Sequence, residues 1–498
     1  MNQVSCLELL KLAAPEIIVV IAALLVLGAD LLALRKLELR LRRIIGAVIA
    51  CVGCLAVVIY MLALPQHANF MQGMLVADPL TQLVKVALLV LTIFTIVISV
   101  ETDFTPHIGE YLALILLAAV GMMFLASSED ILMIFISLEL TSLSLYILTA
   151  FNKRNVNSAE AALKYFLFGG MAAAFTLFGL SLLYGMSGAT NLGQIAAAIK
   201  GPKLDPLLVV AIVMMVIGFG FKVAVVPFHL WAPDAYQGAP APSAALIASG
   251  SKVASFLVFA KVMMIGFKGA EGSAAWHAYL PGWVPVLAVV AGASMVLGNL
   301  AAIVQISVRR LLAYSAIAHA GYMLLGVLSH GGQSLAALIY YVITYALTTL
   351  GAFGVVAVVQ ERAGDDKLSD FAGLSRRAPL LSLCMMIFML SLAGIPPLAG
   401  FFGKFFVFAA ALNTDPKNLG LLWLVIVALA MSAVSLYYYL QVLKQIYVAE
   451  PAADAGPLAT PVASQLALAL LALAVLLLGC APNLLIATLV SAIRLAGL

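Results

Sequence analysis

The chain has 498 residues, of which 64% are hydrophobic and only 10% are charged, and its formal net charge is +4 at pH 7. Soluble domains carry about 25% charged residues and cannot bury this much apolar surface, so the composition excludes a soluble protein. Apolar runs long enough to cross a hydrocarbon core of roughly 30 Å recur along the whole chain. Short segments of alternating polarity, which a transmembrane β-barrel requires, do not occur. The sequence therefore predicts an all-α polytopic membrane protein.

Fourteen transmembrane helices are predicted, in a single transmembrane domain over residues 1–498. The first helix follows Glu8, Lys11 and Glu16. It lacks the basic start and small-residue cleavage site of a signal peptide, so we expect it to remain in the protein. The predicted spans are residues 12–34, 42–64, 80–100, 109–126, 131–151, 160–184, 207–230, 242–266, 284–306, 311–329, 334–359, 380–412, 420–445 and 464–488.

The basic residues of the loops predict the orientation of these spans. Loops that follow odd-numbered spans contain fourteen Lys and Arg residues, whereas the other loops and the two termini together contain six. Cytoplasmic loops of membrane proteins are enriched in Lys and Arg. The odd-numbered loops are therefore predicted to be cytoplasmic, and both termini are predicted to lie on the outer, periplasmic side.

Three loops have a distinctive composition. Residues 187–204 contain NLGQIAAAIKG, a pattern typical of a short amphipathic helix, which we expect on the outer surface. Residues 361–379 form a charged loop on the cytoplasmic side, and residues 449–461 form a loop rich in Ala and Pro that we expect to be mobile. No soluble domain is predicted.

Two spans contain proline where it interrupts a helix. Span seven contains Pro227 and ends near Pro233, and span twelve contains Pro396-Pro397 within LAGIPPLAGFFGKFF. Proline removes a backbone donor and clashes with the preceding turn. Broken helices five spans apart indicate two inverted five-helix repeats, spans four to eight and nine to thirteen. The predicted divisions are residues 1–108 for the first three spans, 109–268 and 283–448 for the two repeats, and 462–498 for the last span.

The five cysteines do not form a metal-binding framework. Cys51 and Cys54 have the spacing of a redox motif, but they lie within the second span, where small apolar packing residues are expected. No nucleotide-binding loop or Rossmann fingerprint is present, so any redox cofactor is expected in a partner.

Six lysines that are not counted with the loops or termini fall within predicted spans, and one acid lies deep in a span, whereas every arginine is counted with a loop or a terminus. The acid is Glu139, near the middle of span five, where an unpaired carboxylate costs at least roughly 2.5 kcal/mol. Lys164, on the next span, is the expected partner. The two residues form either a static ion pair that clamps the helices or part of a titratable chain. The buried lysines are Lys85, Lys164, Lys222, Lys252, Lys261 and Lys404.

Lys222 and Lys252 are predicted near the middle of the membrane. A lysine with little water around it can exist in either protonation state, whereas the guanidinium of arginine stays charged. Such lysines can load and release protons; the alternative is that they extend to the membrane surface. That alternative is favoured for Lys85 and Lys261, which lie nearer span ends and extend to the surface or make loose interhelical contacts.

Three further residues extend this set. Lys404 follows the break in span twelve, where unwound backbone can solvate an ammonium group. His319 is in the middle of span ten and either relays protons or packs as a neutral ring. His229 follows Pro227 and either lines the broken segment or has no special role. The predicted proton pathway contains Glu139, Lys164, Lys222, Lys252, His319 and Lys404, with His229 beside it.

Three sequence stretches carry a family resemblance. They are KVAVVPFHLWAPDAYQGAPAPSAALIASGSK at 222–252, LEL around Glu139, and GIPPLAGFFGKF at 394–405. Together they resemble the antiporter-like membrane subunits of respiratory complex I, a family that includes subunits of Mrp-type cation/proton antiporters. The resemblance covers essentially all spans. Within the family the chain is most similar to the bacterial subunit N group, because it ends at Leu498 without a long lateral helix and has Lys404 where subunit M typically has glutamate.

The resemblance implies a role for each matched residue. Glu139 would couple neighbouring units, with Lys164 as its partner, and Lys222 would be the central proton-loading lysine. Lys252 and His319 would connect the two halves. Lys404 would lead to the exit side.

The resemblance also implies a complex. The chain would be a proton-translocating subunit of NADH:quinone oxidoreductase in the bacterial inner membrane, with no cofactor of its own and no contact with nucleic acid. The expected partners are subunits K, M and J, further along subunits L, A and H, and a peripheral redox arm; FMN, iron–sulfur clusters and quinone would be bound by partner subunits. The alternatives are a Mrp-type antiporter subunit, which a single buried carboxylate disfavours, a scaffold that has lost transport, and a related hydrogenase or plastoquinone-linked complex.

Overall fold

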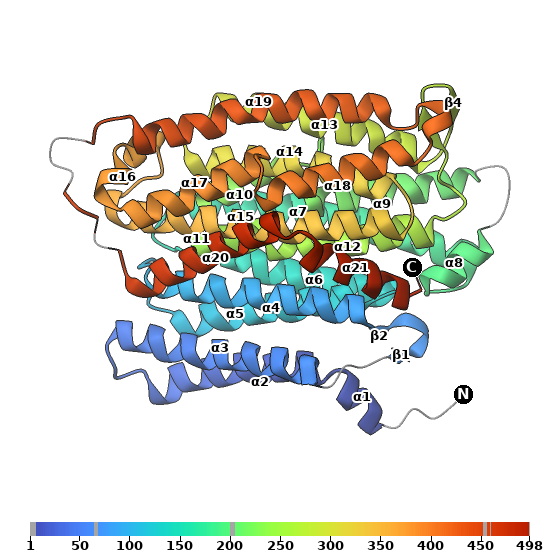
Figure 1. Cartoon of the computed structure of the whole chain (residues 1–498). Helices are drawn as coiled ribbons and strands as arrows, with labels where there is room; N and C mark the ends of the chain where they lie inside the picture. Colours follow the sequence, from blue (N-terminus) through green and yellow to red (C-terminus); the bar gives the residue numbers. More distant parts are fainter. Residues whose placement is uncertain (1–5, 64–67, 200–204, 452–455, 459, 498) are drawn as a thin grey trace.

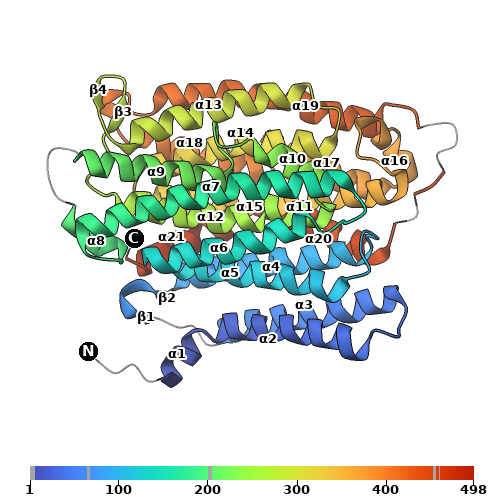
Figure 2. The ribbon, with the colours of Figure 1, turned by 180° about the vertical axis from the view of Figure 1, so that it is seen from behind.

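The computed structural model describes residues 6–63, 68–199, 205–451, 456–458 and 460–497. Long helices lie side by side in one bundle, as Figures 1 and 2 show from opposite sides. Among the described residues, thirteen helices are long and apolar enough to cross a membrane. Two shorter apolar helices, α17 (Pro379–Ala393) and α18 (Ala399–Asn413), occupy the predicted twelfth span. The predicted all-α membrane fold is confirmed.

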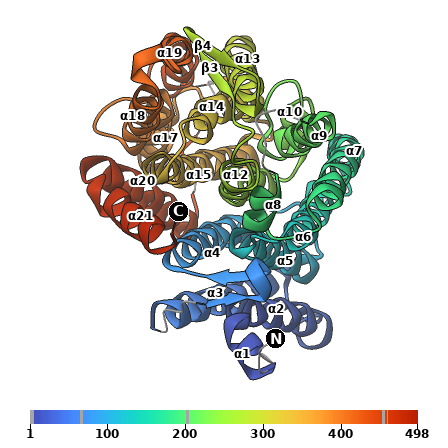
Figure 3. The same cartoon turned by 90° about the vertical axis from the view of Figure 1, so that its right-hand side faces the viewer.

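The N-terminal part of the chain forms two helices at one edge of the bundle and a third next to the remainder, as Figure 3 shows. Its elements are α1 (Cys6–Leu12), α2 (Ala14–Gly28), the π-helical turn η1 (Ala29–Ala33), α3 (Leu39–Ala63), strand β1 (Ala68–Phe70), the 3₁₀ turn η2 (Met71–Gly73), strand β2 (Leu75–Ala77) and α4 (Pro79–Val100). The two strands form an antiparallel hairpin. Asp78 accepts a hydrogen bond from the backbone of Thr81 at 2.7 Å and so caps α4.

The first five-span unit follows. It contains α5 (Ile108–Ser127), α6 (Ile131–Thr149), α7 (Val156–Ser187), the short α8 (Leu192–Ala198), α9 (Pro206–Val223), α10 (Trp231–Gly238), α11 (Ala241–Ala248), α12 (Gly250–Lys261) and the π-helical turn η3 (Val262–Gly266). Helix α8 falls in the segment where an amphipathic helix is predicted, although residues 200–204 of that segment lie outside the described residues.

A hairpin of β3 (Ser273–Ala275) and β4 (Ala278–Leu280) leads to the second unit. That unit contains α13 (Trp283–Ile303), α14 (Val308–Leu328), α15 (Gly332–Ala363), the 3₁₀ turn η4 (Leu368–Phe371), α16 (Leu374–Arg377), α17, α18, the 3₁₀ turn η5 (Pro416–Asn418) and α19 (Leu422–Tyr447). The last helices are α20 (Val462–Cys480) and α21 (Asn483–Leu495). The predicted mobile loop 449–461 lies partly outside the described residues.

The two units share a local structure in the connection that follows their third span. Helices α7 and α15 both have 32 residues and end at a glycine in the left-handed region, Gly188 with φ 66° and Gly364 with φ 85°. Such residues stop a helix because glycine has no Cβ to clash. In Figure 1 the segment after α7, with α8, and the segment after α15, with α16, lie at opposite ends of the bundle. This placement is what an inverted pair of units requires.

The chain segments after these glycines also pair in the same way. In the first unit, the backbone N–H of Leu192 donates to Glu129 at 2.9 Å and that of Ile131 donates to Thr190 at 2.8 Å. In the second unit, the N–H of Leu368 donates to the carbonyl of Ile306 at 2.9 Å, and the N–H of Val308, the first residue of α14, donates to Asp366 at 2.8 Å. Each pair joins the end of the third span to the start of the second, which supports the predicted repeats; their boundaries stay a prediction.

Both predicted helix breaks are present. Helix α9 stops before Ala224, which has φ 59°, and α17 stops before Gly394, which has φ 86°. In each case the peptide bond that begins two residues later, to Pro227 or to Pro397, is cis. The chain then resumes as a helix, α10 or α18. Span seven therefore does not end near Pro233, because α10 continues it to Gly238.

Span eight contains a break that was not predicted. Helices α11 and α12 are separated by Ser249, whose backbone has φ −115° and ψ −82°. Ser249 is followed by Gly250, and such Ser and Gly pairs are common sites of helix kinks. Almost all residues of α11, α12, α14 and α15 are buried. These helices form the centre of the bundle and carry part of the predicted proton pathway.

Candidate functional site

The carboxylate of Glu139 on α6 lies next to the ammonium of Lys222 on α9. The distance from Lys222 Nζ to Glu139 Oε1 is 3.9 Å. Lys222 Nζ also donates a hydrogen bond to Ser142 Oγ, one turn after Glu139 on α6. The Lys222 side chain is 10% exposed and that of Glu139 is 27% exposed. A positive and a negative charge are therefore held together inside the bundle, two residues before the break that ends α9.

Lys164 does not pair with Glu139, which corrects the prediction. Its Nζ is 2.8 Å from Asp234 Oδ2 and 2.7 Å from Glu160 Oε1. Glu160 is one turn earlier on α7, and Asp234 lies on α10, beyond the break. The prediction failed because it used only the depth of the residues in the membrane. Which carboxylate a lysine meets depends on the rotation of its helix about its own axis.

Lys252 is buried in α12, at the centre of the bundle. Its Nζ donates a hydrogen bond to the carbonyl oxygen of Ala316 on α14 at 2.6 Å. The same ammonium lies 5.6 Å from the centre of the Tyr345 ring, a distance at which a cation is attracted to an aromatic face. The Lys252 side chain has no carboxylate partner among the described residues.

His319 on α14 is buried between two tyrosine hydroxyls. Its Nδ1 is 2.8 Å from Tyr341 Oη, and its Nε2 is 3.1 Å from Tyr439 Oη. A hydroxyl can donate or accept a hydrogen bond, so both ring nitrogens have a partner in either tautomer. The ring centre of Tyr345 is 5.0 Å from that of His319. Tyr345 therefore contacts both His319 and Lys252.

Lys404 on α18 contacts the end of the helix that precedes the break. Its Nζ donates hydrogen bonds to the carbonyl oxygens of Leu392 and Ala393 on α17, both at 3.0 Å. It also donates to Ser432 Oγ on α19 at 2.8 Å. The last carbonyls of a helix carry partial negative charge, which stabilises a cation. Backbone carbonyls do receive the Lys404 ammonium, but they belong to the last two residues of α17 rather than to the unwound segment that was predicted to solvate it.

Sequence reasoning missed the polar groups that surround His319 and Lys404. Asn299 on α13 donates to Tyr322 Oη at 2.9 Å and accepts from Tyr438 Oη at 2.9 Å. The Lys404 ammonium lies 5.2 Å from the centre of the Tyr322 ring. One signal was available, because consecutive tyrosines occur inside two spans, a pair in LIYYVITYAL and three in SLYYYL. Buried tyrosine hydroxyls usually require a hydrogen-bond partner.

His229 lies in the connection between α9 and α10, where it was predicted to line the break. The residue is half-buried, and its Nδ1 has no hydrogen-bond partner among the described residues. The structure places His229 in the broken segment between α9 and α10. Its role stays a prediction.

Lys85 and Lys261 do not extend to the surface, and of the two expected alternatives each instead makes a contact with another segment of the bundle. Lys85 is buried, and its Nζ lies 2.7 Å from Glu16 Oε1, also buried, on α2. The two groups form an ion pair without hydrogen-bond geometry. Within the described part of the chain, neither carboxylate oxygen of Glu16 accepts a hydrogen bond. Glu16 lies near the start of the predicted first span, 12–34, and is a buried acid that was not predicted as such. Lys261 is buried too and makes a looser contact with Glu129 at 3.4 Å.

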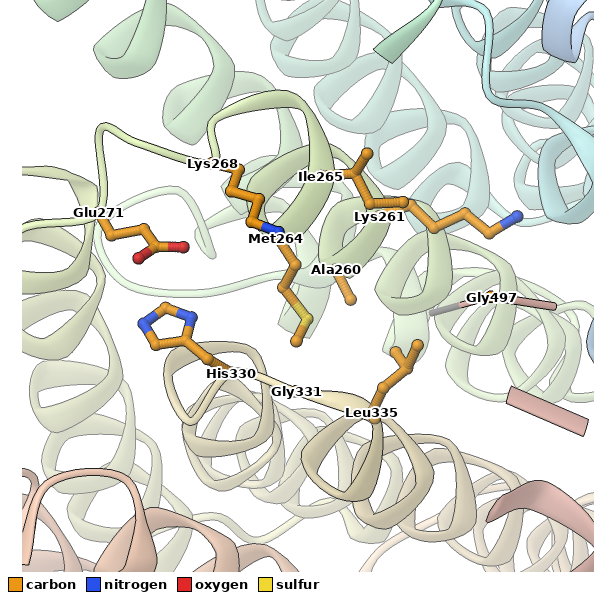
Figure 4. Close-up of a pocket in the computed structure, with 11 residues that line it drawn as sticks. Ala260, Lys261, Met264, Ile265, Lys268, Glu271, His330, Gly331, Leu335 and Gly497 are labelled. Atoms are coloured by element: carbon orange, nitrogen blue, oxygen red, sulfur yellow. The ribbon is translucent and has the colours of Figure 1, made fainter. Parts of the chain in front are cut away.

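A cavity of about 330 Å³, with Lys261 in its lining, lies at the end of the bundle that carries α8. Figure 4 shows Glu271 and His330 on one side of it and Met264 beside them. His330 connects α14 to α15 and has φ 51°. Burial lowers the pKa of His330 below its usual 6.5, and the charge of Glu271 acts in the opposite direction.

Comparisons with known proteins agree with this geometry. The sequence profile of the family described as NADH:quinone oxidoreductase/Mrp antiporter, TM, matches residues 128–432. NADH-quinone oxidoreductase subunit N 2 of Acidobacterium capsulatum is 56% identical over 494 residues, which cover 97% of this chain and 99% of that protein. The profile spans α6 to α19 and therefore contains the predicted pathway from Glu139 to Lys404.

Two solved structures are similar over nearly the whole chain. A chain of respiratory complex I from Thermus thermophilus with bound aureothin is 33% identical, with a TM-score of 0.76 and 96% of this chain and 99% of that chain covered. A chain of the Mrp complex from Dietzia sp. has a TM-score of 0.80 at 22% identity, with 97% of each chain covered, and shows a common fold. From the profile, the sequence identity and these structures it follows that the chain belongs to the NADH:quinone oxidoreductase/Mrp antiporter family of membrane subunits.

Proposed function

We propose that this chain is a proton-translocating membrane-arm subunit of NADH:quinone oxidoreductase, in which electron transfer from NADH to quinone drives protons through the bundle. The observation that carries the proposal is the set of three buried lysines, Lys222, Lys252 and Lys404, each close to a helix break and each with a polar partner. Buried lysines are costly in a membrane and mark proton or ion pathways. The similarity to subunit N over 97% of the chain supports the same function.

The chain's own residues account for proton movement. A nearby carboxylate favours the charged form of a lysine, and its removal or neutralisation favours proton release. The charge of Glu139 therefore controls whether Lys222 holds its proton. Released protons pass towards Lys252, then to His319 between its tyrosine hydroxyls, and on to Lys404. Lys404 has carbonyl and hydroxyl partners in place of a carboxylate, so it can lose its proton without leaving an unpaired buried anion.

The same proposal includes the membrane, the orientation and the partner subunits of the chain. The chain lies in a bacterial inner membrane with both termini on the periplasmic side, which the distribution of loop Lys and Arg residues supports. Its neighbours are subunits K, M and J and, further along, subunits L, A and H. FMN, iron–sulfur clusters and quinone are bound by partner subunits and the peripheral arm.

The test uses the intact complex in native membranes. Complex extracted in mild detergent is expected to show NADH:quinone reductase activity and flavin and iron–sulfur absorbance in the fraction that contains this chain. In vesicles, Lys222→Ala is expected to lower the number of protons moved per NADH oxidised, whereas Lys417→Ala, at an exposed lysine in η5, leaves it unchanged. An unchanged ratio for Lys222→Ala contradicts the proposal. Cation/proton exchange without NADH, in a fraction without chromophores, supports the Mrp-type antiporter instead.

A further inference from the structure

Asp234 holds two cations that come from different parts of the bundle. Its Oδ2 is 2.8 Å from Lys164 Nζ, and its Oδ1 is 2.8 Å from Arg310 Nη1. Each carboxylate oxygen therefore has its own positively charged donor. Lys164 belongs to α7 of the first five-span unit, and Arg310 belongs to α14 of the second. Asp234 itself is on α10, the half-helix that follows the break beside Lys222.

The second unit contacts this half-helix at further points. Arg310 Nη1 also donates to Gln237 Oε1 at 3.2 Å. Arg309 Nη1 donates to the carbonyl oxygen of Ala239, just after the end of α10, at 3.0 Å. Arg309 is buried and its Nε is 2.9 Å from Asp366 Oδ2. Arg309 and Arg310 were predicted as loop residues, but they lie in the first turn of α14 and fix α10 to the second unit.

The contacts of Lys164 exclude its pairing with Glu139 in this conformation. Its ammonium is occupied by Asp234 and Glu160, while Glu139 lies beside Lys222. The side chains of Lys164 and Asp234 are 41% and 27% exposed. Ion pairs with this much exposure contribute little to stability. The Lys164–Asp234 contact can therefore be exchanged for another without unfolding the site.

We propose that Asp234 is a positioning residue for proton translocation, which holds Lys164 away from Glu139 and links Lys164 to Arg310 of the second unit. This inference rests on the proposed function. If Lys164 leaves Asp234, the carboxylate keeps Arg310 as its charged partner among the described residues. The half-helix α10 is then attached through Asp234 to the second unit only. A change of charge at Lys164 is in this way transmitted to α14, the helix of His319.

The experiment compares Asp234→Asn with Asp234→Glu in vesicles that contain the intact complex. The protons moved per NADH oxidised are measured, together with the amount of assembled complex. Asp234→Asn keeps the shape of the side chain and removes its charge, so we expect a several-fold lower proton-to-NADH ratio in the assembled fraction. Asp234→Glu restores the charge and is expected to recover most of the ratio. Asp365→Asn is the control, because Asp365 is an exposed carboxylate paired with Lys367 at 2.9 Å.

The possible outcomes separate this inference from the proposed function. A wild-type ratio in Asp234→Asn, together with a reduced ratio in Lys222→Ala, overturns only the role of Asp234. A wild-type ratio in both variants overturns the proposed function as well. If Asp234→Asn does not assemble, Arg310→Gln makes the same test, because it removes the second cation from Asp234. Here too we expect a lower ratio per assembled complex, and a wild-type ratio overturns the link between the two units.

Discussion

Glu139 Oε1 lies 3.9 Å from Lys222 Nζ, while the ammonium donates its hydrogen bond to Ser142. The carboxylate therefore acts on Lys222 through its charge rather than through a direct hydrogen bond. A charge in surroundings of low polarity acts more strongly than the same charge in water. This relationship differs from the pair predicted from the sequence, because the carboxylate of α6 faces the lysine of α9 rather than that of α7.

Glu139→Gln is expected to reduce NADH-driven proton transport several-fold, because it removes the charge that keeps a proton on Lys222. Proton transport is measured in vesicles by the quenching of a pH-sensitive dye. Glu110→Gln, which alters an exposed acid in the first turn of α5, is the control. Equal transport in Glu139→Gln and wild type would show that the charge of Glu139 has no effect on Lys222.

Tyr439→Phe is expected to slow proton transport without loss of the folded complex. The change removes the hydroxyl that contacts His319 Nε2 at 3.1 Å and leaves the ring in place. Without that partner, one ring nitrogen of His319 has no group to exchange a proton with. Tyr437→Phe is a matched control on the same helix, because the Tyr437 side chain is exposed. If both variants transport protons at the same rate, the hydroxyl of Tyr439 does not take part.

Lys85→Met is expected to destabilise the protein by about 3–5 kcal/mol, because it leaves the buried carboxylate of Glu16 without its cation. Replacing both partners, as Glu16→Leu with Lys85→Met, is expected to recover most of this loss, since two apolar side chains need no partner. Thermal unfolding in detergent measures both changes. Lys36→Met, at an exposed lysine, controls for the loss of charge. A single Lys85→Met variant as stable as wild type would contradict the buried pair.

His330 is expected to make the fold less stable in mild acid. Burial lowers its pKa below the usual 6.5, so the unfolded chain binds a proton at a higher pH than the folded chain. The contribution to stability is complete above pH 6.5 and decreases as the pH falls below that value towards the folded pKa. His330→Asn removes the titration and tolerates the left-handed backbone at φ 51°. The difference in Tm between about pH 7.5 and about pH 5.5 should therefore be smaller in the variant; an unchanged difference would exclude His330 as its source.

The positions of most spans and of the two breaks that contain proline could be predicted from the sequence, whereas the break at Ser249 could not. Apolar runs are long, and proline interrupts a helix whatever surrounds it. The burial of Lys222, Lys252, His319 and Lys404 followed from their place within those runs. For these features, local sequence and membrane thickness are sufficient.

The partners of the charged residues could not be predicted in the same way. Asp234 was overlooked because span seven was expected to end before it, and the structure continues that span as α10. Glu16 was not counted among the acids inside the membrane, although the predicted first span, 12–34, contains it and α2 buries it. A contact between helices depends on their rotation and crossing, and a pattern along one helix does not contain that information.

The oxygen atoms that receive the ammonium groups of Lys252 and Lys404 include main-chain carbonyls, those of Ala316, Leu392 and Ala393. A main-chain oxygen is the same atom whichever amino acid occupies the position. Natural variation at these three positions can therefore change the side chain without removing the acceptor. A one-residue insertion or deletion between Ala393 and Lys404 would rotate the acceptors away from the lysine. In related chains the segment from Ala393 to Lys404 should consequently change its amino acids more readily than its number of residues.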